Sequence, residues 1–280
     1  MNTFWKVYIS TIFLVLISLG TEIASAQVSG YDFRKKYVVN NGQVSGTTNL
    51  TNFPVLIELT DNDFRTTGNG GDVESPNGYD IVFTSDDGST VLDHELVDYN
   101  ASTGLIRFWV RFPTLNATTD TEFFIYYGNS SQTTDQSTSS TWDSSYQLVL
   151  HLDSGSLTDA TVNGNDGTDN GTADAAGKIG RARVFESAND DFIQIPDAAS
   201  LDITGDITIS MWHNPDGFAG GPDLVTKGDY NAAYGTWYDN SGELRFQTDT
   251  DALNSTGTIT NSQWNYLNFT KSSTSGRSIY

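Results

Sequence analysis

Four aromatic side chains lie close together in a polar, glycine-rich stretch, and their chemistry suits the binding of a sugar. They are Tyr230, Tyr234, Trp237 and Tyr238. Sugar rings stack on the faces of tryptophan and tyrosine, while neighbouring polar side chains hold the hydroxyl groups. Packing into a core is the alternative role for each ring, and the sequence leaves both roles open.

Carboxylates could instead cleave a sugar chain, a reaction that needs two of them about 5 Å apart in retaining glycosidases. Asp93 and Glu95 lie two residues apart on a predicted strand, so both point to the same face. Arg107 and Arg111 are available to pair with them, and a solvated, ion-paired surface is the simpler interpretation.

Other catalytic patterns are absent from the sequence. It contains no Gly-x-Ser-x-Gly, no His-Glu-x-x-His and no P-loop. Its three histidines, His94, His151 and His213, are not spaced as metal ligands, and His151 is expected to be a hydrogen-bonded sheet residue. The sequence therefore predicts a protein without enzyme activity.

The composition excludes several classes of partner. The chain carries a net charge of −21 and has no cysteine. We therefore expect no disulfides and no nucleic-acid partner, because binding phosphates needs clustered lysine and arginine. Of its 35 acidic residues, 28 are Asp and only 7 are Glu. Asp favours turns whereas Glu favours helices, so this excess predicts an all-β fold with many loops.

The N-terminus has the pattern of an export signal. Lys6 provides the positive charge, residues 7–19 form a short apolar run, and residues 24–26 (Ala-Ser-Ala) form a small-residue cleavage site. The apolar run is shorter than the roughly 20 residues that cross a bilayer. The sequence thus predicts a signal peptide at residues 1–26, cleaved after Ala26, and a secreted, periplasmic or cell-surface protein.

Short strands at regular intervals predict a β-sandwich in the first mature domain, residues 27–129. The strands are expected at residues 37–39, 53–59, 79–84, 92–99, 105–112 and 123–127. Recognisable motifs in this segment are Tyr31-x-x-Arg34-Lys35, Asn52-Phe53-Pro54-Val55-Leu56, Trp109-Val110-x-x-Pro113 and Tyr126-Tyr127-Gly128-Asn129. The segment resembles a bacterial family catalogued as domain of unknown function 2341, a resemblance that implies no activity.

A Ser- and Thr-rich segment, residues 130–145, predicts a flexible linker, although Trp142 within it is expected to dock on one of the domains. The second domain, residues 146–280, is expected to begin with a strand at residues 146–152. Its later strands are predicted at residues 207–212, 224–227, 234–238, 243–247, 258–260 and 264–269.

Several short motifs follow one another between Gly177 and Trp212. They are Gly-Lys-Ile-Gly-Arg-Ala, Val-Phe, Asp-Asp-Phe-Ile-Gln-Ile-Pro, Ser-Leu-Asp-Ile and Ile-Thr-Ile-Ser-Met-Trp. This order resembles the laminin-G-like branch of the concanavalin A-like lectin/glucanase superfamily. The resemblance implies a jelly roll whose last strands would lie beyond Tyr280. Glucanases of this superfamily carry a Glu-x-Asp-x-x-Glu pattern, which this sequence lacks.

Calcium is implied in part by the same resemblance, because laminin-G-like sandwiches often hold Ca²⁺ at their rim. The acidic loops contain oxygen ligands of the kind that Ca²⁺ prefers, and the best candidates are Asp159, Asp166 and Asp190. Their spacing is not that of an EF-hand, and solvated loops stabilised by Asx turns are the alternative.

Together these features predict an all-β protein of two β-sandwich domains, the second a concanavalin A-like jelly roll. We expect a non-catalytic binding or adhesion protein whose partner is a glycan or another extracellular protein, the sugar resting on analogy of fold. A structural module of a larger envelope protein is one alternative, and a glycoside hydrolase is another.

Overall fold

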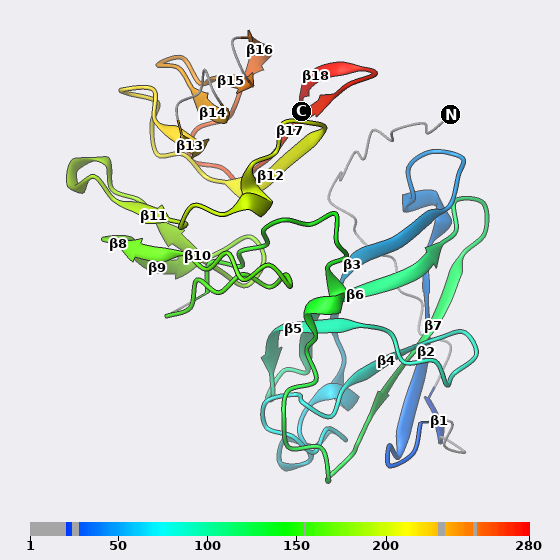
Figure 1. Ribbon diagram of the computed structural model, residues 1–280. Coiled ribbons are helices and arrows are strands. Elements are labelled where there is room, and N and C mark those ends of the chain that lie inside the picture. The colour runs from blue at the N-terminus through cyan, green and yellow to red at the C-terminus, as the bar shows by residue number, and fades with distance from the viewer. Residues whose placement is uncertain (1–20, 24–27, 154, 229–232, 249–250) are drawn as a thin grey trace. The chain divides into compact units, whose positions relative to one another are not determined.

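The computed structural model describes residues 21–23, 28–153, 155–228, 233–248 and 251–280, and it divides the chain into two compact units. The first consists of residues 1–151 with 159–164, and the second of residues 152–158 with 165–280. Figure 1 colours the first unit from blue to green and the second from green to red. No helix in the described part of the chain is long and apolar enough to cross a membrane.

Two antiparallel sheets are present in the described part of the first unit. One has the order β1-β2-β7-β4, with β1 (Thr21–Ile23), β2 (Phe33–Val39), β7 (Thr121–Tyr127) and β4 (Val82–Ser85). The other has the order β3-β6-β5, with β3 (Leu50–Thr60), β6 (Leu105–Leu115) and β5 (His94–Asn100). In Figure 1 these last three strands lie side by side. Apart from β1, a strand was predicted from the sequence at the place of each of these strands.

Alternating apolar residues turn one face of each sheet toward a shared core. Phe83 and Phe123 come from the first sheet and Ile57 and Phe108 from the second, and all four belong to one buried cluster. The rings of Phe83 and Phe108 lie 5.0 Å apart in an edge-to-face arrangement. Two sheets that share a core in this way are a β-sandwich, which is the architecture expected for this part of the chain.

Residues 130–151 belong to the first unit, where the sequence predicted a flexible linker at 130–145. The Leu96 backbone N–H donates to the Ser137 hydroxyl, and the Thr138 backbone N–H donates to the His94 carbonyl. Trp142 is only 6% exposed. The segment therefore lies along β5 as part of the first unit. Trp142 docks on this unit, as expected from the sequence, and helps to hold the segment in place.

The strand predicted at residues 146–152 does not form. Its Val149 instead bonds to a loop of the same unit: its N–H donates to the Asp159 carboxylate and its carbonyl accepts from the Ala160 N–H. The alternating apolar residues in this stretch therefore pack without a neighbouring strand.

The described residues of the second unit form four sheets. Two are short antiparallel pairs, the hairpin β9-β10 and the pair β8-β11 that comes just before and just after it in the chain, formed by β8 (Thr168–Asn170), β9 (Ala173–Ala176), β10 (Arg181–Val184) and β11 (Phe192–Gln194). The third has the order β12-β17-β18, with β12 (Ile207–His213), β17 (Asn265–Ser272) and β18 (Gly276–Ile279). The fourth has the order β13-β14-β15-β16, with β13 (Asp223–Lys227), β14 (Tyr234–Tyr238), β15 (Glu243–Thr248) and β16 (Asp251–Thr258).

The two larger sheets of this unit share a second core. Ile207, Leu267 and Phe269 contribute from the three-stranded sheet, and Tyr234 and Phe246 contribute from the four-stranded sheet. Each of these strands alternates core-facing residues with residues on an outer face. The two outer faces carry the side chains of these strands that do not enter this core.

Helical structure in the described residues is limited to single 3₁₀ turns. These are η1 (Asn41–Gln43), η2 (Asn62–Phe64), η3 (Thr67–Asn69), η4 (Ser139–Thr141), η5 (Ser187–Asn189) and η6 (Ala199–Leu201). The expected all-β class is confirmed. Most of the predicted signal peptide, including the cleavage site after Ala26, lies outside the described residues, whereas β1 pairs with β2.

Candidate functional site

The aromatic residues singled out from the sequence separate into a core set and a surface set. On β14, Tyr234 and Tyr238 alternate into the core and are 7% and 4% exposed. Their hydroxyls donate to the Leu201 and Gly217 carbonyls. Neither ring offers a face to a sugar in solution. Tyr230 lies outside the described residues.

Trp237 points the other way, to the outer face of the four-stranded sheet. The strand register places it between Asp223 on β13 and Arg245 on β15, and Arg245 is in turn opposite Asn254 on β16. Directly opposed residues in antiparallel strands project to the same face. The row Asp223–Trp237–Arg245–Asn254 therefore crosses all four strands, with the half-buried indole near its middle and exposed polar residues at both ends.

The neighbouring row on this face is small where it passes the indole. It consists of Thr226, Gly235, Gln247 and Ala252. Gly235 lies two residues before Trp237 on the same strand, so it is the next position on the same face. Because glycine has no side chain, β14 places nothing beside the indole at that position.

Arg245 supplies hydrogen-bond donors to the same row. Its Nη2 lies 3.3 Å from the Asp239 carboxylate. Hydrogen bonds from the Ser241 hydroxyl and backbone N–H, with a smaller contribution from Arg245, lower the pKa of Asp239 to about 2, so this anion is present to hold the guanidinium. The Arg245 Nε is buried and has no partner among the described residues. A guanidinium has five N–H donors, and the Arg245 side chain is 36% exposed, so its Nη groups can also donate to a bound molecule.

This face, which we call the Trp237 face and define by its four-residue row, combines an aromatic ring with an amide, a guanidinium and a carboxylate. Rings of this kind stack on the apolar face of a sugar, and the polar groups beside them can bond to its hydroxyls. Of the four residues proposed from the sequence, Trp237 is the one that the structure places in such a setting. Arg245 and Asn254 were not anticipated, because only the strand register brings them together.

The three predicted calcium ligands do not come together within one unit. Asp159 belongs to the first unit, whereas Asp166 and Asp190 belong to the second. Asp159 is 5% exposed, and its carboxylate accepts from the Val149 N–H and from the N–H and hydroxyl of Thr161. These contacts already explain a buried carboxylate at this position.

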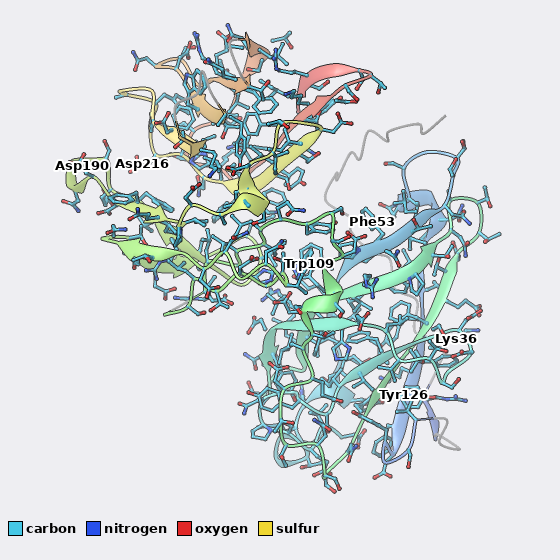
Figure 2. The ribbon with its side chains drawn as sticks, in the orientation of Figure 1. Lys36, Phe53, Trp109, Tyr126, Asp190 and Asp216 are labelled. Atoms are coloured by element: carbon cyan, nitrogen blue, oxygen red, sulfur yellow. The ribbon has the colours of Figure 1, made fainter. Side chains whose placement is uncertain are left out.

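The other two aspartates are exposed loop residues of the second unit. Asp190 ends η5 in the left-handed conformation, with a φ of 54°, at the turn between β10 and β11 (Figure 2). Among the described residues, no group of three or more His, Asp or Glu side chains could hold a metal ion. Calcium binding therefore stays a prediction, and the structure gives Asp159 another role.

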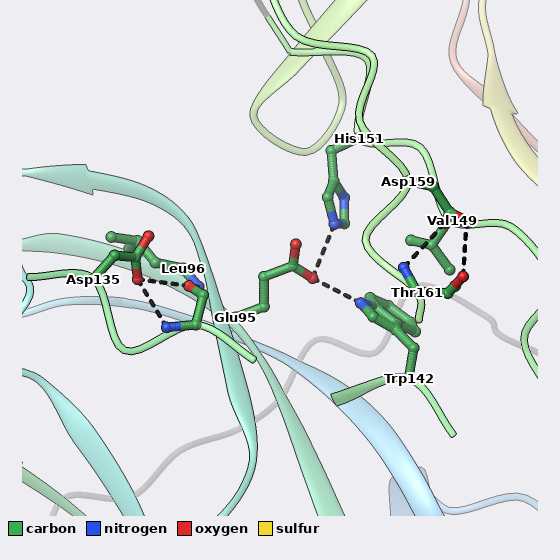
Figure 3. A network of polar contacts seen from close by, with 9 residues as sticks. Glu95, Leu96, Asp135, Trp142, Val149, His151, Asp159 and Thr161 are labelled. Carbon is green, nitrogen blue, oxygen red and sulfur yellow. Dashed lines mark hydrogen bonds and ion pairs between the residues drawn. The ribbon is translucent and has the colours of Figure 1, made fainter. Parts of the chain in front are cut away.

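A polar cluster that the sequence did not reveal lies in the first unit (Figure 3). Glu95 Oε2 accepts from the Trp142 Nε1–H over 2.7 Å and lies 3.1 Å from His151 Nε2. The Trp142 ring packs against Trp109 and Tyr146, with ring centroids 5.3 and 5.1 Å apart. Asp93 does pair with Arg111, as the simpler interpretation of the two carboxylates had it, but Glu95 bonds to residues more than 40 positions further along.

Ion pairs flank this cluster on the outer face of the sheet β3-β6-β5. Trp109, marked in Figure 2, lies on β6 between Arg107 and Arg111. Arg107 pairs with Glu58 and Asp98, each over 2.7 Å. The cluster brings one carboxylate, one imidazole and several rings together at the place where residues 130–151 are attached to the sheet. That arrangement is suited to holding the segment in place.

Comparison with known proteins gives two family matches in different parts of the chain. Residues 77–159 match the family described as Domain of unknown function (DUF2341), and this range includes both β5 and the segment attached to it. Residues 187–280 match the family described as Concanavalin A-like lectin/glucanases superfamily. No curated protein and no solved structure matches the chain. Both resemblances noted in the sequence are thus confirmed: one segment is similar to a family of unknown function, and the C-terminal segment is similar to the Concanavalin A-like lectin/glucanases superfamily, which supports a carbohydrate-binding or related role.

Proposed function

We propose that this protein is a non-catalytic binding or adhesion protein of the cell surface or the extracellular space, and that its second unit binds a glycan on the Trp237 face. The observation that carries the proposal is the row Asp223–Trp237–Arg245–Asn254, which places hydrogen-bonding groups on both sides of a half-buried indole. The similarity of residues 187–280 to lectins and glucanases supports the same class of ligand.

Binding without cleavage is supported by the sequence, which lacks the Glu-x-Asp-x-x-Glu pattern of the glucanases. A reducing-sugar assay on soluble polysaccharides tests this part of the proposal. Release of reducing ends by the purified protein would contradict it.

A binding experiment with a matched pair of variants tests the site. The mature chain is titrated by calorimetry with cello-, xylo-, manno- and maltohexaose and with a galacturonate hexamer. We expect at least one hexamer to bind. Trp237→Ala should weaken its binding to the Trp237 face about tenfold or more, because the variant loses both the stacking, worth about 0.5–1.5 kcal/mol, and the apolar area that the ring buries.

Trp264→Ala makes the same chemical change at a half-buried residue just before β17, which belongs to the other large sheet of this unit, and serves as the control. It should leave the affinity within about twofold, which is about 0.4 kcal/mol. Equal losses in the two variants, with unchanged melting temperatures, would argue against the Trp237 face. Failure of every hexamer to bind would argue against the glycan itself.

Export is a separate part of the proposal and rests on the N-terminal sequence pattern. The intact mass of the protein recovered from outside the cytoplasm should correspond to a chain that begins at Gln27. A recovered chain that still contains residues 7–19 would contradict cleavage after Ala26.

A further inference from the structure

The opposite outer face of the second unit, on the sheet β12-β17-β18, contains a buried amide with an unmet hydrogen bond. Asn268 lies on the central strand β17 and is only 5% exposed. Its Oδ1 is buried and has no partner among the described residues. A buried polar atom without a partner is costly to the folded state, so its presence calls for an explanation.

Strand register shows what surrounds this amide. Asn268 is opposite Ser210 on β12, and its backbone exchanges two hydrogen bonds with Tyr280, of 3.1 and 2.9 Å. The next row on the same face pairs Trp212 with Tyr266. Leu267 and Phe269 alternate to the other side and belong to the core, so Asn268 lies on the outer face beside three aromatic residues.

The surroundings of the amide are partly open to solvent. Ser210 is exposed and Tyr280 is 39% exposed, whereas Trp212 and Tyr266 are half-buried. The Trp212 and Tyr266 rings lie 5.3 Å apart, centroid to centroid, at an angle of 58°. An exposed lysine, Lys178, places its ammonium 5.4 Å from the centre of the Trp212 ring. A small molecule can therefore reach the edge of this group of residues.

We propose that Ser210, Trp212, Tyr266, Asn268 and Tyr280 form a second binding site, for the ring of a sugar whose hydroxyl group bonds to the Asn268 amide. The choice of a sugar rests on the proposed glycan-binding function, but the site itself does not depend on the Trp237 face. A hydroxyl both donates and accepts, so it satisfies the buried atom whichever way the amide is turned. Trp212 and Tyr266 supply ring faces for the apolar side of the sugar.

Two sites on this unit would lie on opposite sides of its core, because the inner faces of the two sheets form that core. A unit built in this way holds two sugar chains at once. It would cross-link a polysaccharide, which a single-site binder cannot do, and two weak sites acting together give a higher apparent affinity for a polymer than for an oligosaccharide.

The test uses the mature chain and the same five hexamers in calorimetric titrations. The unmodified protein should bind two molecules of the favoured hexamer, and Asn268→Leu and Trp212→Ala should each reduce this to one. Trp237→Ala should remove the other site and leave the Asn268 site with its affinity within about twofold. Mixing with the corresponding polysaccharide should form a precipitate that each of the three variants fails to form.

Asn268→Leu removes the polar atoms at nearly constant volume, so it should fold with an unchanged or raised melting temperature. Trp212→Ala alters a half-buried ring and gives an independent variant. Two bound hexamers in both of these variants would overturn the second site while leaving the proposed function intact. The hydrogen-bond partner of the Asn268 amide would then be an ordered water. Binding of one hexamer by the unmodified protein, lost in Trp237→Ala, would do the same. Failure of all hexamers to bind would overturn both proposals together.

Discussion

The indole N–H of Trp142 donates to the Glu95 carboxylate over 2.7 Å, although the two residues lie 47 positions apart. His151 Nε2 reaches the same carboxylate oxygen, and the Trp142 ring covers Trp109 on the neighbouring strand. A segment whose composition is typical of a linker is thereby attached to the sheet β3-β6-β5. The first unit consequently extends to His151 and takes in residues 159–164 as well.

We expect this attachment to decide where the first unit can be cut from the chain. A fragment of residues 28–164 should unfold in one cooperative transition in urea, because it contains the whole unit after β1. A fragment of residues 28–129 should be less stable by about 3 kcal/mol or more, since it lacks Trp142 and exposes Trp109. Equal urea midpoints for the two fragments would contradict the attachment and would mean that residues 130–145 are a flexible linker after all.

Replacing Trp142 should show how much the indole contributes. In the 28–164 fragment, Trp142→Ala should lower the free energy of unfolding by about 3–5 kcal/mol, as for other buried tryptophans. Trp142→Phe keeps most of the ring but loses the donor to Glu95, and should cost about 1–3 kcal/mol. The measurement is equilibrium unfolding in urea.

Glu122→Gln is the control for these variants, because Glu122 makes an exposed ion pair with Lys36 on the opposite sheet. Exposed pairs are worth about 0–1 kcal/mol, so this change should be nearly silent. Should Trp142→Ala cost no more than Glu122→Gln, the indole would not be holding the segment.

How much of this fold could be predicted depends on whether a feature is encoded by neighbouring residues or by residues far apart in the sequence. Period-two alternation identified strands such as β3, β6, β12 and β15, because it reports which face each strand buries. The same alternation in residues 146–152 gave a strand that does not form, because its backbone bonds to Asp159 and Ala160 instead. Alternation indicates burial on one side and says nothing of the partner strand.

The candidate site depended on information that the sequence does not contain. Trp237 could be proposed from its residue type and its polar neighbours. Its position beside Arg245 and Asn254 follows from strand register, which no local pattern reveals. Tyr234 and Tyr238 have the same polar neighbours in the sequence as Trp237, yet they face the core. They lie an odd number of positions from Trp237 on β14, and such positions point to opposite sides of a strand.

Two histidines, the buried His94 and the half-buried His213, should titrate below the usual histidine range. Burial lowers the pKa of His94, whose Nδ1–H donates to the Leu92 carbonyl over 2.9 Å, although this bond and Asp135 and Asp93 oppose the shift. Burial likewise lowers the pKa of His213. In NMR titrations of the full chain, both rings should have midpoints below about 6.5, the value of an unperturbed histidine. Assignment of the two signals by His94→Gln and His213→Gln completes the measurement.

The sign of the effect on stability follows from these directions. An unfolded histidine takes up its proton near pH 6.5, before the folded one does. The contribution of His94 is therefore complete above about pH 6.5 and is lost as the pH falls from there toward its folded pKa. The urea midpoint of the 28–164 fragment should decrease over that interval, and the decrease should be smaller in His94→Gln. Identical pH profiles for the two proteins would contradict a neutral buried ring.

Asp159 and the exposed aspartates should respond differently to calcium. The Asp159 carboxylate accepts from two backbone N–H groups and one hydroxyl, so Asp159→Ala leaves buried donors unsatisfied. We expect a loss of about 3 kcal/mol in the 28–164 fragment, of the same size in Ca²⁺ and in EDTA. A ligand role would instead make the loss disappear in EDTA, where no calcium is bound.

The prediction of a calcium site at the rim of the second unit then rests on Asp166 and Asp190, which are exposed. Calorimetry of the full chain at constant ionic strength checks it, because a charge of −21 responds to any salt. If these loops bind Ca²⁺, the melting temperature of the full chain rises with Ca²⁺ concentration. It rises less with Mg²⁺, because Mg²⁺ demands a tighter octahedron of ligands, and Asp166→Asn removes the difference between the two ions. Equal shifts in Ca²⁺ and Mg²⁺, or none in either, would mean that the acidic loops are solvated turns.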